Sequence, residues 1–506
     1  MARHDVARDT SGDIHAKGLK ENTIGLTESV VIGLASTAPA YSLAATLGFI
    51  VIAVGTQAPI AIVLAFIPML FTAYAYRELN RAVPDCGTAF TWGTKAFGPF
   101  VGWLGGWGVA IAGIVVLANL AQVAGQYLWL TFGADGLAEN TAVVTATGVV
   151  FIALMTYISW RGIDVSARVQ NVLLAVQYLA LLLFVVVALF KVYGGSAPEG
   201  YETPALSWFN PFGFDSLSGF TEAILLAIFI YWGWDTCLAI NEETTDSERT
   251  PGRAAVLSTV ILVATYTLVA VAALAYGGSG DSDLGLANED IADDVFSPLG
   301  DSVLGSWSWV LLLAIVISAA SSTQTTILPT ARGTLAMGAY KALPSRFSEV
   351  HPVYKTPSFS TLVMGVVSIV YYVGLTIISD NFLADSILSL GLFIAFYYSI
   401  VAFACVRYFR RQIFTSTRNF FFLGLLPLLG GLMLTAAFIK SAIDMTDPEY
   451  GYTVLFGIGG AFVLGIGSLL LGVLLMMAWY ASQESKPFFN GETLNDETPV
   501  LVPEDE

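Results

Sequence analysis

Long stretches without a charged residue constrain this chain more than any other feature of its sequence. The hydrocarbon core of a bilayer is about 30 Å thick, and a helix needs about 20 apolar residues to cross it. Residues Gly55 to Pro59 divide the first stretch into two helices, and a less clean segment at 219–241 adds one more. The pattern predicts an all-α membrane protein with twelve transmembrane helices. The charge-free stretches are bounded by Glu28 and Arg77, Lys95 and Asp135, Glu139 and Arg161, Arg168 and Lys191, Arg253 and Asp281, Asp301 and Arg332, Lys355 and Asp380, Asp385 and Arg407, Arg418 and Lys440, and Glu449 and Glu484.

The composition excludes several other classes of protein. Apolar residues make up 56% of the chain and charged residues only 12%, whereas a soluble domain carries about 25% charged residues. The formal net charge of −17 argues against a nucleic-acid partner, because phosphate binding requires clustered Lys and Arg. Cys86, Cys237 and Cys405 match neither a zinc spacing nor a disulfide scaffold. We therefore expect no metal site and no cofactor.

The distribution of basic residues predicts the orientation. Lys and Arg collect in cytoplasmic loops, and with the N-terminus inside, all of the 22 Lys and Arg residues except Lys191 and Lys440 fall on the inner side. We expect a multi-pass protein of the plasma membrane with both termini in the cytoplasm, and a first helix that serves as an uncleaved insertion signal. The acidic residues after about 482 are expected to form a disordered, solvated tail.

Two of the predicted helices contain sequences that favour a break. The first carries Pro39 directly after small and hydroxylated residues at 33–38, and proline removes a backbone hydrogen bond. The sixth carries Gly233 between bulky rings, next to Asp235. A lone proline would normally indicate a simple kink. Breaks in corresponding helices of two halves instead indicate an inverted-repeat transporter whose site lies near the bilayer midplane.

This pattern predicts how the chain is divided. The free N–H groups of a half-helix would bind a carboxylate and exposed carbonyls would bind an ammonium, which suits a zwitterion. The expected parts are a cytoplasmic N-terminal segment (1–28), a first five-helix repeat (29–193), an inverted second repeat (219–408), two further helices (421–481) and an acidic cytoplasmic tail (482–506).

Asp235 is the most informative single residue. An ionised group at the bilayer centre costs about 2.5 to 3.5 kcal/mol, so such residues usually face a cavity or a partner and mark ion or proton pathways. Because burial disfavours the charged form, we expect Asp235 to bind and release a proton. The alternative is a solvated helix end near Glu242 and Glu243.

Two further groups of polar residues lie within predicted helices. Ser318, Ser321 and Ser322 belong to a hydroxyl-rich run that could coordinate Na⁺ or, as is more common, hold helices together. Asn119 and Gln122, with Gln126, have helical spacings and could form a polar stripe that lines a substrate site. Packing is the alternative for that stripe.

Several loop motifs resemble those of the amino acid–polyamine–organocation superfamily of secondary transporters. The similarity covers roughly residues 20 to 410. Its motifs are the chain from Tyr76 to Trp107, Arg161 to Gln170, Glu242 to Thr244 followed by Arg249 to Arg253, and Leu328 to Arg332 with Ala342 to Pro344.

The resemblance implies a LeuT-type fold, with five helices repeated upside down and two additional C-terminal helices. In such relatives the first break holds the substrate carboxylate, which would here fall on Ser36, Thr37 and Ala38. The second break receives the amino group and supplies an aromatic lid, which implies Phe229, Tyr231 and Trp232 beside Gly233 as binding residues. The chain departs from the family in two places: the usual glycine-rich triplet of the first helix is absent, and Gln177 stands where some proton-coupled relatives have Lys.

These observations predict a secondary active transporter of an amino acid or a related amine, working by alternating access. Coupling to H⁺ through Asp235 is favoured, while Ser318, Ser321 and Ser322 keep Na⁺ coupling open. The alternatives are a polyamine or organic cation permease or an exchanger and, in a different class, a channel or an amine sensor. An enzyme is not expected, because no span carries a paired acid and base. A homodimer is compatible with the resemblance.

Overall fold

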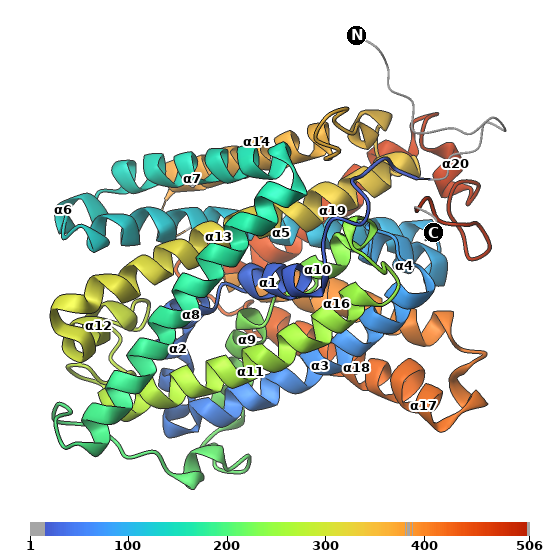
Figure 1. The fold of residues 1–506 in the computed structure, drawn as a ribbon. Coiled ribbons are helices and arrows are strands. Elements are labelled where there is room, and N and C mark those ends of the chain that lie inside the picture. The colour runs from blue at the N-terminus through green and yellow to red at the C-terminus, as the bar shows by residue number, and fades with distance from the viewer. Residues whose placement is uncertain (1–15, 380, 382–384, 387, 503–506) are drawn as a thin grey trace.

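The computed structural model is almost entirely helical, and its helices run along a common direction between two ends of a bundle (Figure 1). It describes residues 16–379, 381, 385–386 and 388–502. A two-residue hairpin pairs β1 (Val454–Leu455) with β2 (Ile458–Gly459). The helices are α1 (Leu26–Ser36), α2 (Pro39–Val54), α3 (Ala58–Ala82), α4 (Ala89–Phe97), α5 (Pro99–Thr131), α6 (Asp135–Ala138), α7 (Thr141–Arg161), α8 (Ile163–Tyr193), α9 (Leu217–Ile230), α10 (Thr236–Ala239), α11 (Thr250–Gly277), α12 (Phe296–Leu304), α13 (Ser308–Ala339), α14 (Ser358–Ile378), α16 (Leu390–Tyr408), α17 (Thr417–Asn419), α18 (Leu426–Asp444), α19 (Gly460–Tyr480) and α20 (Lys486–Phe489).

Many of these helices have the length and composition of membrane spans. Within the described residues, ten helical stretches are long and apolar enough to cross a bilayer. One stretch, Leu26–Ala82, contains α1, α2 and α3, and α9 is apolar but has only 14 residues. Helix α8 exposes large apolar side chains, Leu179 and Phe190 among them, as a lipid-facing helix would. The all-α membrane class is therefore confirmed, while the count of twelve spans stays a prediction.

The bundle has two distinguishable ends (Figure 1). Helices α4 and α20 lie at one end, which we call the terminal end. Helices α6 and α12 lie at the other, which we call the distal end. The short helices α1 and α10 lie side by side near the middle of the bundle. The elements that the sequence singled out as interrupted therefore end and begin inside the protein.

Glycines of α5 allow close contact with its neighbours. A Cβ added at Gly105 would lie 2.7 Å from the carbonyl oxygen of Ala89 in α4, and one at Gly108 would lie 2.9 Å from Cβ of Tyr397 in α16. Helix α5 also packs along α13. These contacts bring α5, α13 and α16 together around the middle of the bundle, where the site lies.

The tail beyond residue 482 differs from its prediction. The sequence suggested a disordered, solvated segment, but the described tail folds onto the terminal end, where Phe488 and Leu494 are fully buried. They pack in one apolar cluster with Leu19, Phe90 and Leu335. The acidic composition misled the prediction because a few apolar residues in the tail are enough to dock it on an existing apolar surface.

Candidate functional site

The first break is a two-residue interruption with left-handed backbone. Helix α1 ends at Ser36 and α2 begins at Pro39, with Ala38 at a φ of 48° between them. The proline lacks an N–H group and breaks the hydrogen-bond ladder, as its position in the sequence predicted. Thr37 is oriented by local bonds, because its hydroxyl donates to the Leu34 carbonyl at 2.8 Å. The backbone of the first transmembrane segment is thus interrupted inside the bundle.

The second break lies against the first. Helix α9 ends at Ile230, and a turn over 231–235 leads into α10. Gly233 has a φ of 116°, and a Cβ added there would lie 2.7 Å from the Ser36 carbonyl oxygen. The hydroxyls of Ser36 and Thr236 are 2.8 Å apart. Both the backbone conformation and the close approach require glycine at this position.

Asp235 is buried at this junction, with 8% of its surface exposed. Tyr398 donates its hydroxyl to Oδ1 at 2.9 Å, and Tyr397 donates to Oδ2 at 3.1 Å. The indole N–H of Trp232 in turn donates to the Tyr397 hydroxyl at 2.5 Å. The alternative interpretation of Asp235 as a solvated helix end is therefore wrong. Among the described residues no base is paired with this carboxylate, and two tyrosine hydroxyls donate to it.

A small cavity lies at the junction of the two breaks. Its volume is about 10 Å³, which is about the space that one water molecule needs. The predicted residues Ser36, Trp232, Gly233 and Asp235 line it, together with Val109, Gly113, Thr236, Thr326, Pro329, Thr330 and Tyr397. The four predicted residues come from both breaks, so the structure gathers them around one point.

A much larger cavity of about 570 Å³ lies on the distal side, where it reaches the residues that precede α12. We call it the vestibule. Tyr41, Asn119, Gln122 and Phe229 line its protein-facing part, and the carboxylates of Glu222, Asp293, Asp294 and Glu449 also border it. The two cavities share no lining residue. The predicted binding residues are thus divided between two spaces.

Three predicted binding residues line neither cavity. Thr37 and Ala38 are buried in the backbone of the first break, with 2% and 1% of their surfaces exposed. Tyr231 is fully buried, and its hydroxyl donates to the Ile62 carbonyl at 3.1 Å. In this conformation these residues are part of the broken backbone but do not face a cavity, and a direct role in binding stays a prediction.

The hydroxyls proposed for a cation site have separate partners. Ser318 Oγ accepts from the Tyr41 N–H at 3.3 Å, and Ser322 Oγ donates to the Ser36 carbonyl at 2.8 Å. Ser321 donates to the side-chain oxygen of Gln170 in α8. Each bond ties α13 to a different helix, which corresponds to the interhelical role weighed against ion ligation. The cation site itself stays a prediction.

The sequence reasoning missed Tyr41, Tyr397 and Tyr398. Tyr397 and Tyr398 supply hydroxyl donors to Asp235, and Tyr41 lines the vestibule. The only signal for the pair was two adjacent tyrosines within a charge-free span. Their partner is more than 160 positions away in the chain, so no local spacing could connect them.

A buried ion cluster seals the terminal end. Lys17, 2% exposed, donates from Nζ to Asp85 Oδ2 at 2.8 Å and to Glu242 Oε1 at 2.7 Å. A third bond of 2.8 Å reaches the carbonyl oxygen of Leu501 in the tail. The N-terminal segment, the loop after α3, the exit of the second break and the tail therefore meet at one ammonium group.

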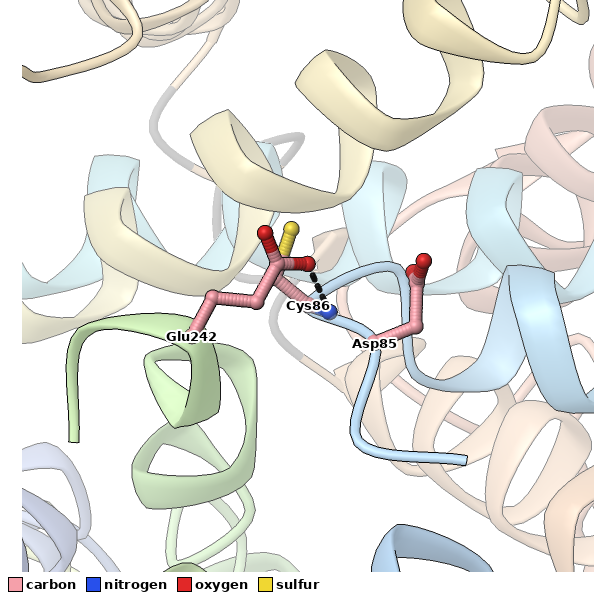
Figure 2. Close-up of side chains that lie close together, drawn as sticks. All are labelled: Asp85, Cys86 and Glu242. Atoms are coloured by element: carbon pink, nitrogen blue, oxygen red, sulfur yellow. Dashed lines mark hydrogen bonds between the residues drawn. The ribbon is translucent and has the colours of Figure 1, made fainter. Parts of the chain in front are cut away.

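The cluster also contains three atoms that could ligate a metal. Asp85, Cys86 and Glu242 lie close together, with the Cys86 N–H donating to Glu242 Oε1 at 2.9 Å (Figure 2). Both carboxylates, however, already accept hydrogen bonds from Lys17. An ammonium thus occupies the position between them, and the arrangement is an ion pair network in this conformation.

Burial and charge act in opposite directions on this network. Burial disfavours the Lys17 ammonium, but Asp85 and Glu242 outweigh it and raise the pKa of Lys17 well above its usual value. Burial also opposes ionisation of Asp85, but Lys17 lowers the pKa of that carboxyl. At Glu242 burial prevails and raises the pKa. Lys17 and Asp85 therefore form the principal charged pair.

A second buried pair supports the same end. Arg332 donates from Nε and Nη2 to the two carboxylate oxygens of Glu243, at 2.6 and 3.0 Å, and both side chains are fully buried. The backbone of Glu243 also accepts from Thr23 and Ile24 N–H groups, at 2.9 and 3.0 Å. The N-terminal segment is therefore bound directly to the chain that leaves α10.

Comparison with known proteins decides the family. A family model described as amino acid permease matches residues 22–463, which includes both breaks and both cavities. The chain belongs to the amino acid permease family. The superfamily resemblance seen in the loop motifs is thereby confirmed.

Curated relatives of this permease are transporters. It is 29% identical to an uncharacterized transporter of Mycobacterium tuberculosis over 68% of this chain and 72% of the relative. It is 26% identical to the branched-chain amino acid permease BcaP of Lactococcus lactis over 78% and 84% of the two chains. The low-affinity putrescine importer PlaP of Escherichia coli is 25% identical, over 83% and 88%. With its apolar helices, the permease is a multi-pass membrane transporter and not an enzyme.

Proposed function

We propose that this permease moves an amino acid or a related amine across the plasma membrane by alternating access, coupled to H⁺. The observation that carries the proposal is the junction of two broken helices beside a buried carboxylate with no basic partner among the described residues. This junction lies between a distal end that contains a large cavity and a terminal end that is closed by buried ion pairs. A carrier requires a central site that can close toward one side at a time. This asymmetry supports a carrier over a channel.

The proposed architecture has twelve spans. Helices α1 with α2 and α9 with α10 would be the discontinuous first and sixth spans of a LeuT-type fold, within repeats at 29–193 and 219–408. Helices α18 and α19 would be the two additional spans, at 421–481. The clustering of basic residues supports a cytoplasmic terminal end, which would hold residues 1–28 and 482–506. Light scattering of the purified protein would distinguish a monomer from the homodimer that the sequence allowed.

In the proposed cycle, the substrate binds between the breaks and Asp235 carries the coupled proton. Ser36, Thr37 and Ala38 would present backbone groups to the carboxylate, and Trp232 and Gly233 would border the amino group. A protonated Asp235 can itself donate a hydrogen bond, whereas the ionised form accepts from Tyr397 and Tyr398. Loss or gain of this proton therefore changes the bonds that join α10 to α16.

Uptake into proteoliposomes tests the proposal. Purified permease would be supplied with labelled amino acids and amines under an imposed H⁺ or Na⁺ gradient. Accumulation driven by the H⁺ gradient is expected. The carrier proposal is overturned if no solute accumulates against its gradient under either ion.

An Asp235→Asn variant tests the coupling residue. We expect it to exchange substrate across the membrane but to lose accumulation driven by H⁺, because the amide cannot bind the coupled proton. Asp281→Asn, which neutralises an exposed carboxylate in the loop before α12, is the matched control. Unchanged proton-driven accumulation by Asp235→Asn would remove this residue from the coupling role.

Sodium coupling is the second candidate. It is favoured by the buried hydroxyls of Ser318, Ser321 and Ser322 beside the first break. Uptake that depends on a Na⁺ gradient and is lost in Ser322→Ala, at unchanged protein stability, would favour it over H⁺ coupling.

A further inference from the structure

The connection between α16 and α18 concentrates arginines at one place on the terminal end. Four of them fall within residues 407–418, and no Asp or Glu occurs between residues 386 and 443. They are Arg407, Arg410, Arg411 and Arg418. Figure 1 shows α17, which belongs to this connection, at a corner of the bundle away from α20. The docked part of the acidic tail around α20 therefore lies apart from these arginines.

One side of the connection is fixed to α3. Arg418 donates from Nη2 to Oε1 of Glu78 at 2.8 Å, and Arg77 donates from Nη2 to the same oxygen at 2.7 Å. The guanidinium groups of Arg77 and Arg418 also lie over the ring of Phe422, 5.2 and 5.7 Å from its centroid, within the cation–π range of about 6 Å. Glu78 is thus already paired with Arg77 and Arg418.

The other three arginines are exposed and keep their charges unpaired. In the part of the chain that the structure describes, Arg407, Arg410 and Arg411 form no ion pair with a carboxylate. Arg410 donates from Nη1 to the carbonyl oxygen of Arg407 at 3.0 Å. Because each guanidinium has five N–H donors and no acceptor, most of the donors on these three side chains are open to solvent or to an anion.

Phenylalanine rings are exposed in the same connection. Phe414 exposes 84% of its surface, Phe420 38% and Phe421 42%. The ring centroids of Phe414 and Phe420 are 6.1 Å apart, and those of Phe420 and Phe421 are 5.4 Å apart, so the three rings form one patch. This patch lies at the start of the apolar stretch Thr417–Asp444, which is long enough to span a bilayer. Exposed apolar patches of this kind mark contacts with an apolar partner.

The arginines and the rings together select an anionic phospholipid. Guanidinium groups bind phosphate with paired hydrogen bonds, and exposed rings beside a basic face insert at the boundary between head groups and acyl chains. A soluble anion would satisfy the arginines but leave the rings in water. A zwitterionic lipid brings its own cation to the phosphate. Basic clusters directly beside a membrane span are accordingly attracted to anionic lipids.

We propose that the α16–α18 connection binds the head group of an anionic phospholipid, with Arg407, Arg410 and Arg411 contacting the phosphate and Phe414 inserted beside the acyl chains. The inference goes beyond the proposed transport function and does not rest on it, because binding requires no transport. It requires only that the stretch Thr417–Asp444 crosses the bilayer, which places the connection at the depth of the head groups.

The proposed lipid site is linked to the central junction through α16. Arg407 lies in the last turn of this helix, and Tyr397 and Tyr398, which donate to Asp235, lie earlier in the same helix. A lipid bound at Arg407 therefore holds the terminal end of a helix that packs at the centre of the bundle. Bound lipid should consequently raise the thermal stability of the whole protein.

Thermal unfolding in nanodiscs of defined composition tests the site. The full chain would be placed in discs of phosphatidylcholine alone or of phosphatidylcholine mixed with phosphatidylglycerol, and we expect a higher Tm in the anionic discs. The triple variant Arg407→Gln, Arg410→Gln, Arg411→Gln should lose most of this gain. The matched control neutralises three other exposed arginines of the chain and should keep the gain: Arg249→Gln, Arg253→Gln, Arg346→Gln. No gain in the unmodified protein, or an equal gain in the triple variant and the control, overturns the inference.

A local reporter decides the question even if the triple variant fails to fold. Thr417, an exposed residue of α17, would be replaced by Cys in a background without the native cysteines and labelled with an environment-sensitive fluorophore. Phosphatidylglycerol should shift the emission to shorter wavelengths, and the shift should shrink in Phe414→Ser and at higher ionic strength. An emission that does not respond to phosphatidylglycerol refutes the site. The same shift produced by inorganic phosphate in phosphatidylcholine discs would identify a soluble anion as the ligand and overturn the assignment to a lipid.

Discussion

The terminal and distal ends of the permease differ in whether their acidic side chains are paired with basic ones. At the terminal end, Lys17 and Arg332 are matched by Asp85, Glu242 and Glu243 inside the protein. At the distal end, carboxylates border a cavity of about 570 Å³, and no Lys or Arg of the described chain lines that cavity. One end is therefore held together by its own charge pairs, whereas the other keeps a large cavity with carboxylates at its border.

Removal of Lys17 should have the largest effect on the contrast between the ends. Lys17→Ala leaves Asp85 and Glu242 buried beside each other without a cation, and breaking a buried pair costs about 3–5 kcal/mol. We expect the terminal end to open, with labelling of Cys86 by a maleimide at least tenfold faster. Lys20→Ala, a change at an exposed position of the same segment, is the control.

The labelling measurement requires Cys86 to be the only reporter. Cys237 and Cys405 are also free and buried, so both would be replaced by Ser in the background. An unchanged labelling rate in Lys17→Ala would show that the ion cluster does not hold this end closed.

Removal of the tail should have the next largest effect. Truncation after Glu484 deletes Phe488 and Leu494, and burial of one such side chain contributes about 1.5–3 kcal/mol. It also removes the Leu501 carbonyl from Lys17. We expect faster labelling of Cys86 than in the full chain, but slower than in Lys17→Ala, because the two carboxylates still bind the ammonium. Truncation after 502 is the control, and equal labelling in both truncated proteins would contradict a sealing role.

Neutralising the two carboxylates separately should give unequal effects. Asp85 accepts hydrogen bonds from Lys17, Tyr340 and Thr91. In Asp85→Asn the amide N–H₂ group would face one or more of these donors and could not accept from them, which should destabilise the protein by about 2–3 kcal/mol. Glu242→Gln keeps an acceptor oxygen and should have an effect of about 1 kcal/mol or less. Thermal unfolding in detergent measures both. Equal shifts would contradict the assignment of Lys17 and Asp85 as the principal pair.

The pH dependence of the same two groups has opposite signs. The charge of Lys17 outweighs burial and lowers the pKa of Asp85. The ionised Asp85 therefore stabilises the folded protein above pH 3.8, the ordinary pKa of the group, and this stabilisation is lost as pH falls through the lowered pKa. Burial raises the pKa of Glu242. The protonated Glu242 therefore contributes to the stability of the folded protein below pH 4.5, the ordinary pKa of the group, and this contribution is lost as pH rises through the raised pKa. Thermal stability followed across pH should lose only the latter transition in Glu242→Gln. Persistence of that transition would assign it to another group.

The smallest effects are expected from removing one hydroxyl at each end. Tyr340→Phe removes one of the donors to buried Asp85 and leaves the Leu501 N–H without an acceptor, which should cost about 1–3 kcal/mol. Tyr127→Phe removes a donor to half-buried Asp294, where water can replace it, so about 1 kcal/mol or less is expected. Thermal unfolding compares the two. A larger loss in Tyr127→Phe would reverse the contrast between the ends.

Local chemistry made part of this architecture predictable. Charge-free runs indicated the membrane helices. Pro39 and Gly233 marked the breaks, because proline lacks a backbone N–H and glycine allows a positive φ. The burial of Asp235 was also predictable, because this residue lies within an apolar span.

The rest depended on contacts between distant residues. Nothing near Asp235 in the sequence indicates Tyr397 and Tyr398, and nothing near Lys17 indicates Glu242 or Leu501. The division of the predicted binding residues between two cavities likewise depends on how α2, α5 and α9 pack. The tail was assigned from its average composition, which hid the apolar Phe488 and Leu494.

The bond from Lys17 to the Leu501 carbonyl has a consequence for biosynthesis. The two residues are 484 positions apart, so the ribosome must synthesise every helix of the bundle before the acceptor exists. Until then the lysine can meet only the acids made in between. The seal at this end is therefore the last contact to assemble, and an incompletely translated permease would enter the bilayer with that seal unfinished.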